Sequence, residues 1–112
     1  MNYNRNLVEF RGIEIPQEEA NILKEIENQR GKEFHLVSEI NNFGPRRLEF
    51  AVKNKNIIEI GCPKYTLDSL SASIGNLKVL EKLYIKWNKL STLPESIGNL
   101  TSLKMLNYLV IS

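Results

Sequence analysis

The sequence contains few residues of the kinds that carry out chemistry. Its 112 residues include one cysteine, one histidine and one tryptophan, so an internal disulfide is excluded and no thiol cluster is available to a metal. No apolar run approaches the ~20 residues that cross a bilayer. The N-terminus also lacks the apolar stretch of about 7–15 residues that marks a signal peptide. We therefore expect a cytoplasmic protein without membrane contact.

Catalytic and nucleotide-binding motifs are also absent: there is no P-loop, G-x-G-x-x-G, H-E-x-x-H or G-x-S-x-G. His35 has no partner that the sequence places beside it, and we expect an ordinary surface or half-buried side chain. Cys62 is expected to pack as a small apolar residue. Adjacent Glu18 and Glu19 do not face each other on a helix, and they favour its positive N-terminus. We expect no enzymatic activity, cofactor or metal.

Charge is unevenly distributed along the chain. Residues 1–52 carry seven Lys/Arg and nine Asp/Glu, a balance of −2, whereas residues 53–112 carry eight lysines and four acidic residues, a balance of +4. Nucleic-acid interfaces usually cluster Arg and Lys within a recognisable motif, and here the lysines are scattered. Nonspecific nucleic-acid binding by the lysine-rich half is therefore only a weaker alternative.

What the sequence does contain is an internal repeat. Residues 67–83 (LDSLSASIGNLKVLEKL) align without a gap to residues 90–106 (LSTLPESIGNLTSLKML). Nine pairs of identical residues lie 23 positions apart, including an intact S-I-G-N-L string. Self-similarity at one fixed offset is the signature of stacked structural units.

The spacing inside the unit indicates its type. Residues 80–100 read L-x-x-L-x-I-x-x-N-x-L-x-x-L-P-x-x-I-x-x-L, which resembles the intracellular class of leucine-rich repeat. Leu83 and Ile85 alternate as a short strand buried on one face would. The resemblance implies that the side-chain amide of Asn88 satisfies backbone groups where the chain turns. The structural positions of the unit are Leu83, Ile85, Asn88, Leu90, Leu93, Ile97, Leu100 and Leu103.

The resemblance covers residues 57–112, about half the chain. In the first unit Tyr65 replaces the asparagine and Ser71 the proline. The third unit has Leu106 and Tyr108 at strand positions before the sequence ends. We expect about two coils and a truncated third.

Residues 1–56 are predicted to cap the first coil. Pro16 suits a first helical position and Gly31 a helix stop, so we expect a helix over about 17–30. A strand over about 47–52 is expected to turn back at residues 53–56 into the first repeat strand. The expected fold is α/β: a leucine-rich repeat mini-solenoid with a short parallel sheet, capped by a helix and a β-hairpin.

Repeats of this type use the concave sheet face for binding, and the resemblance therefore directs attention to the outward strand positions. Exposed aromatic side chains are favoured interface anchors. Trp87, the single tryptophan, and Tyr84 are predicted to be such anchors. The alternative is structural: Trp87 folds over the edge to shield the apolar interior, and Tyr84 stacks against Lys86 without a partner. The predicted partner-binding residues are Lys82, Tyr84, Lys86, Trp87 and Glu59.

Two functional hypotheses follow from these features. The first is a protein–protein interaction module of the kind that scaffolds signalling partners, binding a protein or peptide. The second is a truncated N-terminal fragment of a longer repeat protein with only a structural role. Residues 106–111 form an apolar segment without proline, and such a strand at an open sheet edge recruits another strand. We therefore also expect a homodimer joined there or poor solubility, the alternative being that the last residues fold back over the core.

Overall fold

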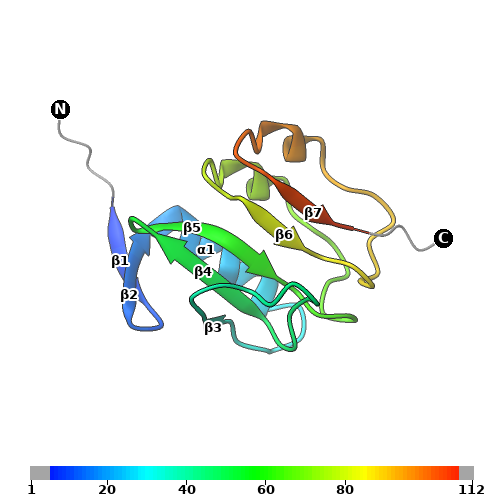
Figure 1. Cartoon of the computed structure of the whole chain (residues 1–112), viewed down its shortest axis with the longest axis horizontal. Coiled ribbons are helices and arrows are strands. Elements are labelled where there is room, and N and C mark those ends of the chain that lie inside the picture. Colours follow the sequence, from blue (N-terminus) through cyan, green and yellow to red (C-terminus); the bar gives the residue numbers. More distant parts are fainter. Residues whose placement is uncertain (1–5, 109–112) are drawn as a thin grey trace.

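The computed structural model describes residues 6–108. Within them the chain is mixed α/β, with two sheets and one α-helix (Figure 1). The elements are β1 (Leu7–Phe10), β2 (Ile13–Pro16), α1 (Gln17–Glu27), β3 (His35–Leu36), β4 (Glu49–Lys53), β5 (Asn56–Gly61), the 3-10 helix η1 (Ala72–Asn76), β6 (Lys82–Tyr84), the 3-10 helix η2 (Glu95–Asn99) and β7 (Met105–Asn107).

The first two strands form a hairpin that the sequence analysis did not resolve. β1 and β2 pair antiparallel through Arg11 and Gly12, whose φ values are 53° and 85°. Two central residues with positive φ are typical of a type I′ turn, which matches the twist of the flanking strands. A single apolar stretch therefore becomes two short strands.

Helix α1 begins where the sequence predicts and ends earlier. Pro16 precedes the first helical residue, and the helix stops at Glu27. Residues 28–30 form a turn closed by Gly31, whose backbone N–H donates to the Glu27 carbonyl at 2.9 Å and whose φ is +67°. Ile22, Leu23 and Ile26 of the helix are buried in the core.

Glu19 does more than favour the helix N-terminus. Its carboxylate is buried and accepts hydrogen bonds from the backbone N–H of Ile57 at 2.8 Å and the side-chain amide of Asn56 at 2.7 Å. A buried carboxylate requires such donors. Glu19 thus fastens α1 to the beginning of β5, a role that helical position alone does not reveal.

The larger sheet has the strand order β3-β4-β5-β6-β7. β4 and β5 form the predicted antiparallel hairpin, and β5, β6 and β7 are parallel. The paired residues of the parallel strands are Glu59–Lys82–Met105, Ile60–Leu83–Leu106 and Gly61–Tyr84–Asn107. Each step is 23 residues, so the sequence repeat and the strand register coincide.

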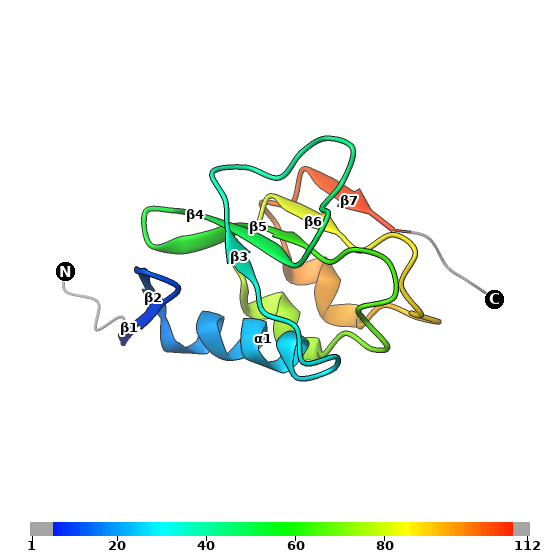
Figure 2. The ribbon, with the colours of Figure 1, turned by 90° about the horizontal axis from the view of Figure 1, so that it is seen from below.

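The elements lie in layers (Figure 2). α1 and the two 3-10 helices cover one face of the larger sheet, and the loop of residues 37–48 passes over the other face. The core lies between sheet and helices. Among the repeat positions, Leu83, Ile85, Asn88, Leu90 and Leu100 are buried, whereas Leu93, Ile97 and Leu103 are half-buried.

Candidate binding site

The sheet face opposite α1 is covered by the chain itself. In the loop of residues 37–48, the backbone N–H of Ile40 donates to Glu59 Oε1 at 2.8 Å. The loop also sits directly on Gly61: a Cβ there would lie 2.8 Å from Pro45 Cβ and 2.9 Å from Ile40 Cδ1. Only glycine leaves room for this approach. The loop therefore occupies the β5 part of the surface where a concave-face ligand would rest.

This covering changes the exposure of the predicted partner-binding residues. Glu59 is 5% exposed and Tyr84 only 1%, so the expectation that both face solvent is wrong. Lys82 is half-buried, with its Nζ 3.8 Å from Glu59 Oε2. Lys86 and Trp87 are exposed. The 23-residue pattern did not reveal the burial because the covering loop lies outside the repeat.

A cavity of about 930 Å³ opens beside the covered face, at the carboxyl ends of the parallel strands. Its walls come from the loop of residues 42–48, the turn of residues 62–66, and Lys86 with Trp87. We call it the carboxyl-end cavity. Tyr84 also lines it, so three predicted site residues meet there. Glu59 and Lys82 are not part of its lining.

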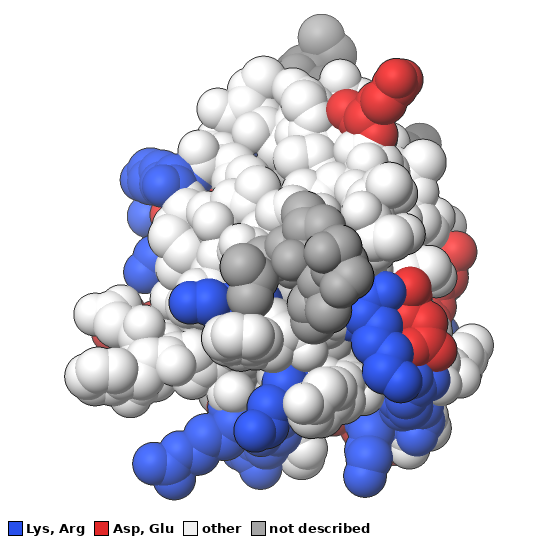
Figure 3. Space-filling model, turned by 90° about the vertical axis from the view of Figure 1, so that its right-hand side faces the viewer, with Lys and Arg blue, Asp and Glu red and all other residues white. Residues whose placement is uncertain are grey.

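The carboxyl-end cavity is rich in cationic side chains. Figure 3 looks onto the carboxyl ends of the strands, and Lys and Arg gather over the lower half of this face. The cations lining the cavity are Lys32, Arg46, Arg47, Lys64 and Lys86. Glu33 is the one acidic lining residue among the described residues. Sequence reasoning missed this cluster because four segments far apart in the chain contribute to it.

Three aromatic rings are exposed around the same cavity. Phe43 is 99% exposed, Tyr65 61% and Trp87 51%. Tyr65 and Trp87 have φ values of 66° and 64°, a conformation that is unusual for bulky side chains. Such strain costs roughly 1–3 kcal/mol and persists where the surrounding structure enforces it, often at functional sites.

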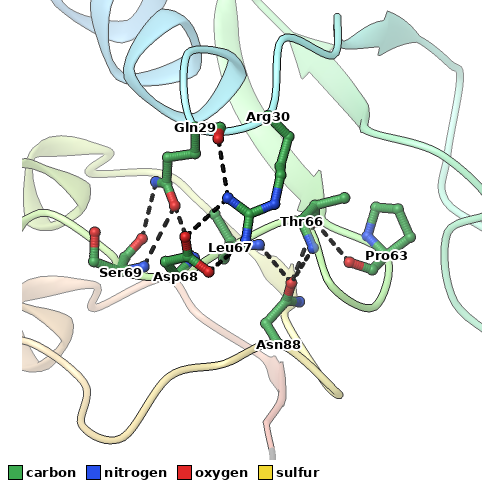
Figure 4. Close-up of polar contacts among 8 residues, drawn as sticks. All are labelled: Gln29, Arg30, Pro63, Thr66, Leu67, Asp68, Ser69 and Asn88. Carbon is green, nitrogen blue, oxygen red and sulfur yellow. Dashed lines mark hydrogen bonds and ion pairs between the residues drawn. The ribbon is translucent and has the colours of Figure 1, made fainter.

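Asn88 holds the turn that carries part of this rim (Figure 4). Its Oδ1 accepts the backbone N–H groups of Thr66 at 2.9 Å and Leu67 at 2.7 Å. Its Nδ2 donates to the carbonyls of Cys62 at 3.1 Å and Ile85 at 3.2 Å. The amide therefore joins two segments that lie one 23-residue repeat apart, as the sequence resemblance implies for this position.

A second set of polar contacts joins the turn after α1 to the first coil (Figure 4). Arg30 donates two hydrogen bonds to the carboxylate of Asp68, one of them 2.8 Å long. Gln29 Oε1 accepts the backbone N–H of Asp68 at 2.8 Å. The hydrogen bond from Arg30 lowers the pKa of Asp68 below its ordinary value. The segment that follows the cavity rim is thus fastened to the turn after α1.

Titratable groups at the cavity are suited to binding. Tyr84 is buried, and its hydroxyl has no hydrogen-bond partner among the described residues. Burial raises its pKa, so the hydroxyl stays protonated at neutral pH and remains a donor. Burial also raises the pKa of Cys62, which keeps its thiol protonated and a poor nucleophile. His35 is exposed on the cavity wall.

Among residues 6–108, no group of three or more His, Cys, Asp or Glu side chains is arranged to hold a metal ion. No helix in the same range has the length and apolar character needed to cross a membrane. Comparisons with protein-family models, with curated proteins and with solved structures found no match to this chain.

Proposed function

We propose that the chain is a protein-interaction module of the leucine-rich repeat type, which binds a protein or peptide at the carboxyl-end cavity. The observation that carries the proposal is the gathering of Phe43, Tyr65 and Trp87, all more than half exposed, around one cavity. Aromatic anchors beside a pocket are typical of the residues that dominate binding energy.

The repeat character of the proposal has its own support. The parallel strands pair at steps of 23 residues, and Asn88 bridges neighbouring coils through its amide. Stacked units that bury one another's apolar faces have this arrangement. The binding surface differs from the one expected from the resemblance, since it lies at the carboxyl ends of the strands rather than across their face.

The proposal is tested by selecting random octapeptides, displayed on particles, on the immobilised full chain. Peptides should be enriched on the wild type, and enrichment should disappear when both Phe43 and Trp87 are replaced by alanine. Val79→Ala is the matched control, because Val79 is a 40% exposed apolar residue outside the cavity. Equal enrichment on the wild type and the double variant would contradict the proposal.

A second candidate function concerns the edge of the sheet. Leu106 is 38% exposed, whereas Leu83 and Ile60 at the same strand position are fully buried. We infer that a further strand covers β7, supplied by a second copy or by additional repeats, as the homodimer and fragment hypotheses require. Of the predicted dimer segment, residues 109–111 lie outside the described residues.

Light scattering on the full chain at several concentrations gives its molar mass and so tests whether two copies pair through β7. A dimer that Leu106→Lys converts to a monomer supports pairing between copies. A monomer at every concentration argues against it.

A further inference from the structure

The charges at the carboxyl-end cavity indicate the kind of partner that it takes. Outside the cavity, five of the nine cationic side chains in residues 6–108 are paired with carboxylates: Arg11 with Glu27, Arg30 with Asp68, Lys55 with Glu14, Lys82 with Glu59, and Lys104 with Glu81. The other four, Lys24, Lys53, Lys78 and Lys89, come from separate segments of the chain.

The five cations of the cavity, by contrast, line one hollow. Of these five, only Arg47 has an ion pair within residues 6–108, with its Nε 3.8 Å from Glu49 Oε2. Lys64 and Lys86 instead lie over the rings of Tyr65 and Trp87, at 5.9 Å and 5.8 Å from the ring centres. Lys32 and Arg46 have no carboxylate partner within residues 6–108. Four unpaired cations and the carboxylate of Glu33 thus line one hollow, and their net positive charge favours an anionic ligand.

The same walls also provide apolar contact. Phe43 and Trp87 present exposed rings, and Pro45 and Leu48 line the cavity with them. The unpartnered hydroxyl of Tyr84 adds one neutral donor. A ligand that satisfies all of these groups carries negative charges next to a bulky apolar group and offers a carbonyl or carboxylate oxygen.

We propose that the carboxyl-end cavity binds an acidic peptide segment in which Asp or Glu residues flank a bulky apolar side chain. This inference rests on the proposed function and specifies its partner. The number of uncompensated charges suits a short segment. A nucleic-acid strand carries one charge per nucleotide and is bound by domains with a pI above about 9, whereas this chain has a formal net charge of +2 and a pI of about 8.7.

The experiment uses the octapeptide selection and measures the mean net charge of the enriched peptides. Peptides selected on the wild type should be more acidic than the starting library. The shift should disappear on the variant Arg46→Gln/Lys86→Gln. The control variant Lys24→Gln/Lys53→Gln removes the same total charge at exposed positions outside the cavity and should preserve the shift.

One enriched acidic peptide is then synthesised and titrated against the full chain, with the fluorescence of Trp87 as the signal because the chain has no other tryptophan. Arg46→Gln/Lys86→Gln should weaken binding about tenfold, which is what losing ~1.4 kcal/mol produces. The control variant should leave the affinity within about twofold, since isolated surface charges contribute little.

The outcomes separate this inference from the proposed function. Enriched peptides that need Phe43 and Trp87 but show no acidic shift would overturn the inference and leave the interaction module standing. Absence of any cavity-dependent enrichment would overturn both. The full chain is also titrated with an oligothymidylate octamer. Suppose that the octamer binds saturably, that Arg46→Gln/Lys86→Gln abolishes this binding, and that no acidic peptides are enriched. The cavity would then be assigned to nucleic acid instead.

Discussion

Residues 73–77 and 96–100 share the sequence S-I-G-N-L and the same 3-10 conformation, yet their burial differs. Ile74 is 1% exposed and Gly75 is buried, whereas Ile97 is half-buried and Gly98 has no atom within 4 Å of its Cβ position. The first copy lies between α1 and the second copy. The second copy lacks an outer neighbour within the described residues. The contribution of a repeat to stability therefore depends on its neighbours as well as on its own sequence.

The largest expected effect on the free energy of unfolding comes from removing the hydrogen bonds of the Asn88 side chain. Asn88→Ala leaves buried groups of residues 62, 66, 67 and 85 without their side-chain partner. Each such group costs roughly 1–3 kcal/mol, so we expect a loss of about 4 kcal/mol from the free energy of unfolding. Urea denaturation followed by circular dichroism measures it. Asn99→Ala, at an exposed asparagine, is the control and should change little.

The next largest effect on the free energy of unfolding is expected at three residues that pair with one another across β5, β6 and β7. Ile60→Ala and Leu83→Ala create cavities in the core and should each cost about 3 kcal/mol. Leu106→Ala, at the 38% exposed equivalent position, should cost less than about 1 kcal/mol in the monomeric chain and more where a further strand covers β7. Urea midpoints measure all three. A cost at Leu106 equal to that at Leu83 would mean that β7 is covered in solution.

Gly75 and Gly98, the equivalent glycines of the two S-I-G-N-L copies, also differ in their surroundings. A Cβ at Gly75 would lie 2.6 Å from Ser96 Cβ and 2.7 Å from the Ser96 carbonyl oxygen, so Gly75→Ala should cost about 2 kcal/mol through overpacking. At Gly98 the added methyl group meets open space, and the change should stay within about 0.5 kcal/mol. Thermal unfolding of the two variants provides the measurement. Similar losses at both sites would indicate that another unit stacks on η2.

A smaller effect is expected where the first coil departs from the repeat. Tyr65 stands at the position that Asn88 holds one unit later, and its φ of 66° is unfavourable for a bulky residue. Asparagine tolerates this conformation better, so Tyr65→Asn should stabilise the fold by about 1 kcal/mol. It should also weaken peptide binding, because an exposed ring is lost. Tyr65→Phe keeps the ring and the strain, and we expect neither quantity to change.

The smallest effect concerns an ion pair that only the first coil makes. The pKa of Asp68 is lowered first by its hydrogen bond from Arg30, whereas the equivalent residue one unit later is Ser91. A lowered pKa in the folded state means that the stabilisation is present above about pH 3.8, the ordinary value, and is lost as the pH falls through the folded pKa. Melting temperatures measured from pH 6 to pH 2 should therefore fall less steeply for Asp68→Asn. Parallel curves for the two proteins would refute this.

The sequence was sufficient for features that rest on local pattern. The 23-residue offset predicted which residues pair in β5 and β6, and the turn at residues 53–56 joins the predicted hairpin. The early end of α1 and the hairpin at Arg11 and Gly12 escaped prediction, because turns of two or three residues leave a weak signal within an otherwise apolar or helical segment.

Some residues of the candidate site could likewise be predicted from the repeat pattern, and others could not. Lys86 and Trp87 follow directly from the repeat register and are exposed. Phe43 and Arg46 gave no signal, since they lie on a loop outside any periodic segment. Tyr84 was expected at the surface and is buried; it pairs with Gly61, on which that loop rests.

The sequence by itself determined the repeat length, the strand register and the inward positions of each unit, because periodic apolar residues specify which face of a short strand is buried. Only the tertiary structure decided which unit is covered, where the loop of residues 37–48 rests and which cations gather at one cavity. These outcomes depend on contacts between segments far apart in the chain, and no local pattern records such contacts.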